Sequence, residues 1–191
     1  MSGRKYLHPG GDSVKSRTLL LGALLATAAL LAACSGGPGP LGTGGDWGSV
    51  CTPGALDHPV TDGMSLLYNT GTTPVTVTSV KLEAPRGVTM TKAWLMPFYK
   101  PPHGALSYVG AGEPYPPTSW HEWPNRQPIP GAVIKPGQGL NLFFGLTRTT
   151  AGSAWIDGPV ITYTANRTSY TLQEQFGFQI TGWPSCPRLG T

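Results

Sequence analysis

The residues best suited to recognition chemistry lie in one segment, residues 97–130, where proline and aromatic residues are concentrated. Nine of its 34 residues are proline, and its centre reads Trp120-His121-Glu122-Trp123. A stretch of this length without a strand or helix pattern is uncommon inside a domain, and such loops are often functional. Because proline restricts the backbone, aromatic rings can be presented here at low entropic cost. The candidate recognition residues are Tyr99, Tyr115, Trp120, His121 and Trp123.

The same composition has a plainer interpretation, in which the aromatic side chains cap an open end of the fold as a satellite core. The two interpretations predict different exposures. A recognition surface for an envelope protein, a peptide or a glycan predicts that Trp120 and Trp123 are partly exposed on one patch. A structural cap predicts that both are buried.

Histidine and methionine side chains raise a copper hypothesis, because imidazole and thioether groups suit copper. A blue-copper site needs a cysteine with His and Met close to it late in the chain, and Cys186 has neither. A metal-handling protein stays an alternative, and it requires at least two of the candidate side chains to converge. These are His58, His103, His121, Met64, Met90 and Met96. The methionines also suit strands as core residues, and we expect no metal or cofactor.

Catalytic signatures are absent from the sequence. It contains no HExxH, G-x-S-x-G or P-loop motif. Glu113 and Glu122 could in principle form a carboxylate pair, as in a hydrolase of cell-envelope material. Surface glutamates near prolines are more typically solvated. We therefore expect a protein without enzymatic activity, with such a hydrolase as a further alternative.

The first 33 residues have the parts of a secretory signal. Lys15 and Arg17 supply a positive start, and Leu19–Leu31 is an apolar run of 13 residues. A transmembrane helix needs about 20 apolar residues, so this run is too short to span a bilayer comfortably. Translation from Val14, a residue that a GTG start codon can encode, would give a signal of 20 residues, within the usual range of about 15–30.

The end of the apolar run, Leu31-Ala32-Ala33-Cys34, resembles the lipobox of bacterial lipoproteins. The resemblance implies cleavage between Ala33 and Cys34, a diacylglyceryl group on the Cys34 sulfur, and Cys34 as the mature N-terminus. Two acyl chains anchor a protein stably, whereas one gives marginal binding. Residues 34–50 are rich in Gly and Pro and are expected to be a flexible tether. The expected location is the extracytoplasmic face of the cell membrane.

Charge argues against nucleic acid as a partner. The chain carries a net charge of +4, and residues 1–33 contribute +3 of it, which leaves +1 for the mature protein. A nearly neutral domain without a stripe of Lys and Arg lacks the electrostatic footprint of nucleic-acid binding. The expected partners are the membrane, through the lipid, and an envelope protein, peptide or glycan.

With Cys34 acylated, as the resemblance implies, Cys51 and Cys186 remain. Both are expected in an oxidising compartment, so a disulfide between them is the natural pairing. A metal pair or a reactive thiol has no support, since the sequence contains no CxxC spacing and no His follows Cys186.

Residues 51–191 show period-two patterning rather than helical patterning. In Leu140–Leu146, for example, Leu140, Leu142, Phe144 and Leu146 share one face. Val75–Glu83 changes parity near Thr78-Ser79, which suggests a bulge. The other expected strands are 64–69, 88–98, 132–134, 159–165 and 169–180, the last two forming a hairpin around residues 166–168. About seven short strands predict one all-β, antiparallel immunoglobulin-like β-sandwich domain over residues 51–191.

Overall fold

The computed structural model describes residues 39–44, 48–100, 102, 105, 107, 109–182 and 186, and these form strands joined by turns. Their helical segment is the short 3₁₀ helix η2 (Trp123–Asn125). No helix in this part of the chain is long and apolar enough to cross a bilayer. The strands are β1 (Leu41–Thr43), β2 (Gly48–Pro53), β3 (Pro59–Asn69), β4 (Val75–Leu82), β5 (Val88–Pro97), β6 (Ala111–Pro114), β7 (Gln127–Pro128), β8 (Ala132–Ile134), β9 (Gly139–Arg148), β10 (Ala154–Ile156), β11 (Pro159–Ala165), β12 (Thr168–Gln173) and β13 (Phe176–Thr181).

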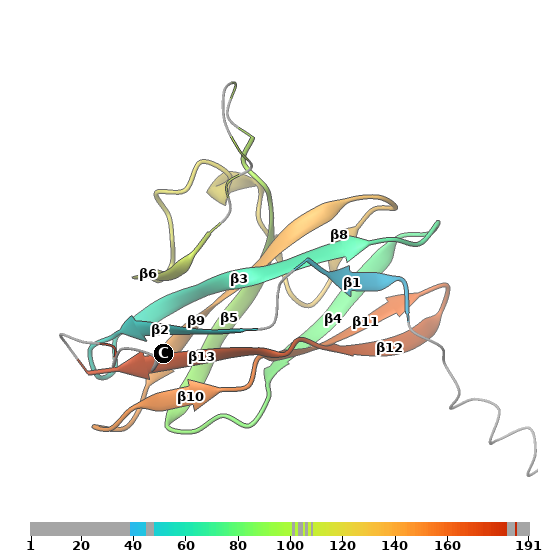
Figure 1. Ribbon diagram of the computed structural model, residues 1–191. Helices are drawn as coiled ribbons and strands as arrows, with labels where there is room; N and C mark the ends of the chain where they lie inside the picture. Colours follow the sequence, from blue (N-terminus) through green and yellow to red (C-terminus); the bar gives the residue numbers. More distant parts are fainter. Residues whose placement is uncertain are drawn as a thin grey trace, which may run out of the picture. The chain divides into compact units, whose positions relative to one another are not determined.

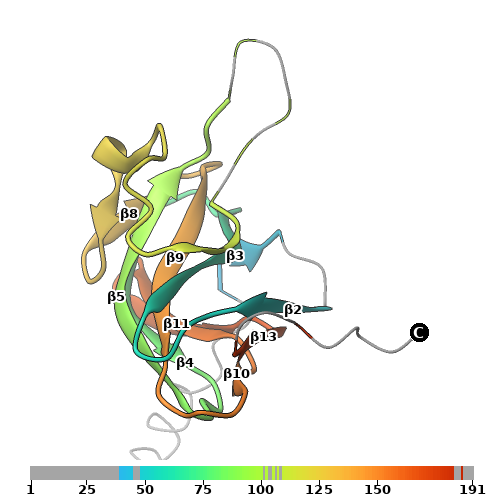
Figure 2. The same ribbon diagram turned by 90° about the vertical axis from the view of Figure 1, so that its left-hand side faces the viewer.

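The strands form two layers around a shared core (Figures 1 and 2). One layer is the sheet ordered β1-β3-β9-β5-β7, with β6 paired to β3. The other layer consists of the four-stranded sheet β12-β11-β4-β8 and the three-stranded sheet β10-β13-β2. The pairing of the named strands is antiparallel except between β2 and β13. The prediction of an all-β, immunoglobulin-like sandwich is therefore confirmed.

The core between the layers is built by the alternation that the sequence shows. From β9, Leu140, Leu142, Phe144 and Leu146 point inward, and each is 0% exposed. Full burial of such a side chain stabilises the fold by about 1.5–3 kcal/mol. The opposite layer supplies side chains such as Ile161 of β11 to the same cluster. β9 thus lies at the centre of the fold.

Two local predictions are confirmed. The register between β4 and β11 shifts at Thr78, which is not paired with any residue of β11. The parity change in the sequence is therefore a β-bulge. β11 and β12 form a hairpin around Asn166 and Arg167, whose φ angles are 49° and 66°. Two central residues with positive φ match the twist of the flanking strands in a tight hairpin.

The single strand predicted over 169–180 is wrong. β12 ends at Gln173 in one sheet, and β13 begins at Phe176 in another. The apolar residues keep the same parity from β12 into β13, and all of them pack on the core. The hydrophobic pattern therefore does not reveal that the chain passes from one sheet to another. Strands β1, β2, β6, β7 and β10 were also not predicted, because they have two to six residues and no usable alternation.

The boundary between tether and domain, predicted at residues 50 and 51, is too late. β1 pairs with β3, and β2 begins at Gly48 and pairs with β13. Edge pairing through backbone hydrogen bonds needs no apolar alternation. The Gly-rich sequence therefore gives no sign of these two strands. Leu41, only 4% exposed, is the apolar anchor of this region. The folded unit spans residues 39–191.

The predicted disulfide is confirmed. Cys51 in β2 is bonded to Cys186, with their Cα atoms 5.8 Å apart and a sequence separation of 135. It ties the first part of the domain to its last part. The predicted signal peptide 1–33, the cleavage residue Ala33 and the lipidation residue Cys34 lie outside the described residues, as does His103.

Candidate functional site

The described residues of segment 97–130 pack on the outer face of the sheet at β5 and β9. Phe143 of β9 pairs with Trp94 of β5 on this face, and Asn141 pairs with Met96. Met96, Val109 and Phe143 are buried there as a second apolar cluster, separate from the main core. The partly buried rings packed on this cluster are Trp94, Tyr115, Trp120 and Trp123. We call segment 97–130 with Trp94 the aromatic cover.

Asn141 fixes the aromatic cover to the sheet. Its Nδ2 donates to the carbonyl oxygens of Gly63 at 2.7 Å and Ser65 at 3.2 Å, and its Oδ1 accepts from the Val109 amide at 3.0 Å. The side chain is 0% exposed. At Gly63 a Cβ would lie 2.3 Å from the Val109 carbonyl oxygen, so only glycine permits this close approach. The cover is therefore positioned by specific polar contacts as well as by apolar packing.

The ring polar atoms of Trp94, Tyr115 and Trp120 are hydrogen-bonded. Trp94 Nε1 donates to the Tyr115 hydroxyl at 3.0 Å, and that hydroxyl donates to the Lys92 carbonyl oxygen at 2.5 Å. Trp120 Nε1 donates to Glu113 Oε2 at 2.6 Å. These bonds fix the ring orientations, and a fixed aromatic ring loses little entropy when it binds a partner.

Two cations lie over the indole rings. The Arg126 guanidinium is 4.2 Å from the Trp123 ring centroid and 4.8 Å from that of Trp94. It also donates through Nη1 to the Trp123 carbonyl oxygen at 2.8 Å. Lys92 Nζ lies 4.4 Å from the Trp94 centroid. Such cation–π contacts contribute about 0.5–1 kcal/mol each at exposed sites. The surface thus alternates cations and aromatic rings.

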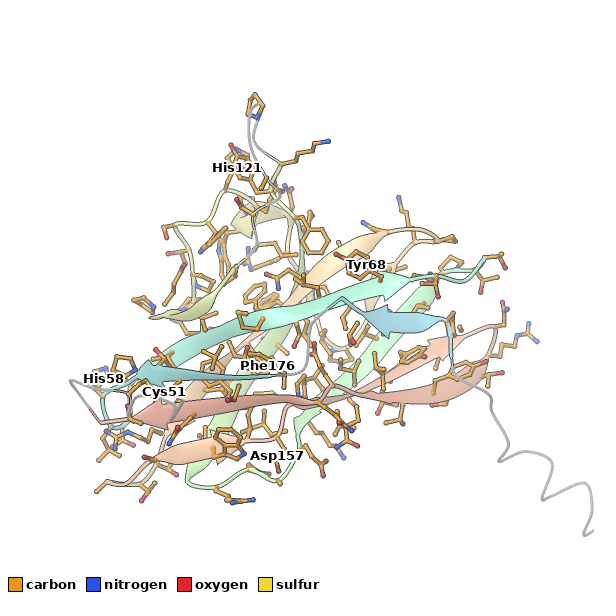
Figure 3. The ribbon with its side chains drawn as sticks, viewed as in Figure 1. Cys51, His58, Tyr68, His121, Asp157 and Phe176 are labelled. Atoms are coloured by element: carbon orange, nitrogen blue, oxygen red, sulfur yellow. A yellow bond between two sulfur atoms is a disulfide. The ribbon has the colours of Figure 1, made fainter. Side chains whose placement is uncertain are left out.

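His121 is the most solvent-exposed of the predicted recognition residues, with its side chain 68% exposed (Figure 3). Its ring lies 4.5 Å from that of Tyr99 between centroids, and its Nδ1 is 3.2 Å from Glu122 Oε1. Trp120 and Trp123 are half-buried. The five predicted residues therefore lie on one cover, and the two tryptophans are neither fully exposed nor fully buried. The rings pack on a separate apolar cluster, as the satellite-core interpretation predicts, but this cluster lies on the outer face of β5 and β9 and not at an open end of the sandwich.

Among the described residues, the candidate histidines are not gathered into one site. Figure 3 shows His58 and His121 at separate ends of the fold. No group of three or more His, Cys, Asp or Glu side chains able to hold a metal occurs in the described residues. Met96 is buried in the outer cluster, and Met90 packs against the main core.

The two candidate carboxylates are already engaged. Glu113 accepts from the Trp120 indole at 2.6 Å. Glu122 accepts from Asn125 Nδ2 at 2.6 Å and contacts His121. These hydrogen bonds hold neighbouring side chains of the aromatic cover in place.

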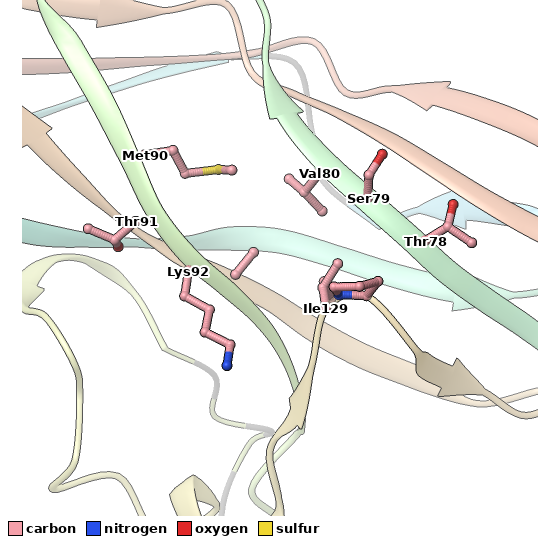
Figure 4. A pocket seen from close by; sticks show the side chains of 9 residues that line it. Thr78, Ser79, Val80, Met90, Thr91, Lys92 and Ile129 are labelled. Atoms are coloured by element: carbon pink, nitrogen blue, oxygen red, sulfur yellow. The ribbon is translucent and has the colours of Figure 1, made fainter.

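A small pocket of about 220 Å³ opens between β4 and β5, beside Ile129 and Pro130 (Figure 4). Small-molecule sites are commonly about 300–1,000 Å³, so this pocket is small for one. Lys92 is the charged residue among those lining it, and its ammonium is directed over Trp94. No acid–base or nucleophilic pair converges among the lining residues.

A buried pair of acids was missed in the sequence. Asp62 of β3 pairs with Phe144 and therefore faces the core, and it is 1% exposed. Burial and the nearby Glu174 carboxyl raise the pKa of Asp62 from 3.8 to about 7, although the Met64 amide donates to it. Burial also raises the pKa of Glu174; the Ser65 hydroxyl opposes this rise, but neither Ser65 Oγ nor Glu174 Oε2 has a well-formed hydrogen bond. The sequence does hold a signal for the burial of Glu174. This residue falls between Leu172 and Phe176 in the series of alternate residues whose side chains face the core.

No protein-family model and no curated protein sequence matches the chain. Among solved structures, the chain is similar to the ASH / PapD-like domain of human CEP192 (PapD-like domain 7), with a TM-score of 0.40 and 9% sequence identity over 80% of this chain and 92% of that chain.

Proposed function

We propose that this chain is a membrane-anchored extracytoplasmic lipoprotein whose folded unit is a non-catalytic binding module. The anchor rests on Leu31-Ala32-Ala33-Cys34, which follows a positive start and a short apolar run. The Cys51–Cys186 disulfide is consistent with an exported protein, because such bonds persist in oxidising compartments.

The observation that carries the binding role is the aromatic cover. It combines half-buried Trp120 and Trp123 with Arg126 and the exposed His121 on a fixed frame. Trp, Tyr and Arg are the residue types that dominate the energetics of protein interfaces, usually in partly enclosed settings. A purely structural cover needs apolar packing, but it does not need cations stacked on its outer rings.

The partner that fits this surface best is another envelope protein. The rings are half-buried, and the neighbouring pocket of about 220 Å³ is small for a metabolite. The surface carries the cations Lys92 and Arg126 as well as the carboxylates Glu113 and Glu122, so it offers charges of both signs. Such a mixture favours a complementary protein surface over a polyanion.

The test is chemical crosslinking and pull-down of the lipidated full-length protein from its own membranes. We expect a defined partner with the wild type and at least about fivefold less of it with Trp120→Ala or His121→Ala. Leu56→Ala, at an exposed residue elsewhere, is the matched control and should retain the partner. Thermal melting checks the fold of each variant. Equal recovery with folded Trp120→Ala and His121→Ala would overturn the proposal, and Cys34→Ala separates anchoring from recognition.

A further inference from the structure

A second surface feature lies on the three-stranded sheet β10-β13-β2, away from the aromatic cover. It is a pocket of about 390 Å³, within the range of about 300–1,000 Å³ common for ligand sites. Figure 3 shows Asp157, which lines it, on the opposite side of the view from His121. The lining residues are Gly48, Trp155, Asp157, Gln173, Gln175 and Gly177.

Trp155 forms the flat wall of this pocket. A Cβ at position 177 would lie 2.4 Å from the indole atoms Cη2 and Cζ2, so glycine at 177 lets the ring lie directly on the backbone of β13. The Trp155 Nε1–H donates to Asp157 Oδ1, and the backbone of Trp155 exchanges two hydrogen bonds with Arg86. The half-buried indole is therefore held in one orientation before any ligand arrives.

The polar side chains around the ring select the class of ligand. Gln173 and Gln175 are exposed, and each amide offers both a donor and an acceptor. Asp157 Oδ1 is used by the indole, which leaves Oδ2 to accept from a hydroxyl. No Lys or Arg lines the pocket, so a phosphate or another anion finds no counter-charge there.

We infer that this pocket binds a neutral saccharide. A pyranose ring has an apolar C–H face that stacks on an indole and a rim of hydroxyl groups that pair with amides and carboxylates. Trp155 provides the platform, and Gln173, Gln175 and Asp157 provide the rim. The site uses no residue of the aromatic cover, so it stands independently of the protein-binding role proposed above.

The test is a binding screen of the full-length protein, kept in a detergent without a sugar headgroup, against neutral oligosaccharides of glucose, mannose, galactose and arabinose. Saturation-transfer NMR detects contact, and calorimetry gives the affinity. We expect one saccharide class to bind, and Trp155→Ala to weaken it by about tenfold or more. Trp155→Phe should retain part of the affinity, and Gln173→Ala with Gln175→Ala should weaken it severalfold.

The matched control is Trp120→Ala, a tryptophan removed from the other surface, which should bind the saccharide as the wild type does. Far-UV circular dichroism and thermal melting check the fold of every variant. The inference is overturned if no saccharide in the panel binds, or if folded Trp155→Ala binds as the wild type does. Failure of the partner pull-down described above would leave this inference intact.

Discussion

The buried Asp62 gives a quantitative prediction. Replacement of Asp62 by Asn keeps the size of the side chain but removes its titration. In the folded protein the Asp62 pKa is about 7, whereas its ordinary value is 3.8. The folded state therefore retains a proton that the unfolded chain releases above about pH 4.

The direction in which stability changes with pH follows from this difference in pKa. The stability that Asp62 contributes is fully present below about pH 4 and is lost as pH rises through 7, because the ionised carboxylate is then buried in the core. A rise from 3.8 to about 7 corresponds to roughly 4 kcal/mol, since each pKa unit is worth about 1.4 kcal/mol. Asp62→Asn avoids this loss. The free energy of unfolding of the variant, relative to that of the wild type, should therefore rise by roughly 4 kcal/mol between pH 4 and pH 8.

The assay is urea unfolding of both proteins with the disulfide intact, at several pH values from 4 to 8.5. Taking the difference between variant and wild type at each pH removes the titration of groups that the substitution does not affect. Asp57→Asn is the matched control, because Asp57 is exposed in a turn with φ of 60°, a conformation that Asn adopts readily. Its difference from the wild type should stay within about 0.5 kcal/mol at all pH values.

A difference between Asp62→Asn and the wild type that is constant from pH 4 to pH 8 would refute the reasoning. So would a trend of opposite sign. Either result would mean that the Asp62 carboxylate is stabilised in the core at least as well as it is in water.

Three further predictions concern the frame of the molecule. Asn141→Ala should lower the free energy of unfolding by about 2–3 kcal/mol and remove hydrogen-exchange protection of the Val109 amide, because buried partners are left unpaired. Cys51→Ala with Cys186→Ala should cost about 4–5 kcal/mol in urea unfolding, as the loss of a loop of 135 residues implies. Cys34→Ala should move the protein from the membrane fraction to the soluble fraction, and mass spectrometry of the mature N-terminal peptide should find the lipid on wild-type Cys34.

Much of the sandwich could be predicted because its central strands bury one face in a regular way. β9 alternates large apolar residues over its length, and the hairpin at Asn166-Arg167 joins two β-rich runs. The disulfide could be predicted once Cys34 was assigned to the lipid anchor, because Cys51 and Cys186 were then the two remaining cysteines. Strands such as β1 and β7 could not be found, because a few residues held by edge hydrogen bonds have no periodic signal.

The position of the aromatic cover could not be predicted, although its residues could. The sequence places Asn141 and Phe143 on the face of β9 opposite the core, where solvent is the usual neighbour. Phe143 was the available sign that this face is covered. Asn141 gave no such sign, because its role depends on the Val109 amide, which is 32 residues away. Trp155 was missed for a similar reason, since its platform depends on Gly177 in another strand.

The central claim is that the aromatic cover contacts a protein partner in the cell envelope. The most direct measurement places a photo-reactive amino acid at position 121 of the lipidated protein and irradiates intact cells. A matched probe at position 56, at the exposed Leu56, controls for random collision. The account predicts one defined protein adduct from position 121 that is absent from position 56. The same adducts from both positions, or none from position 121, would contradict it.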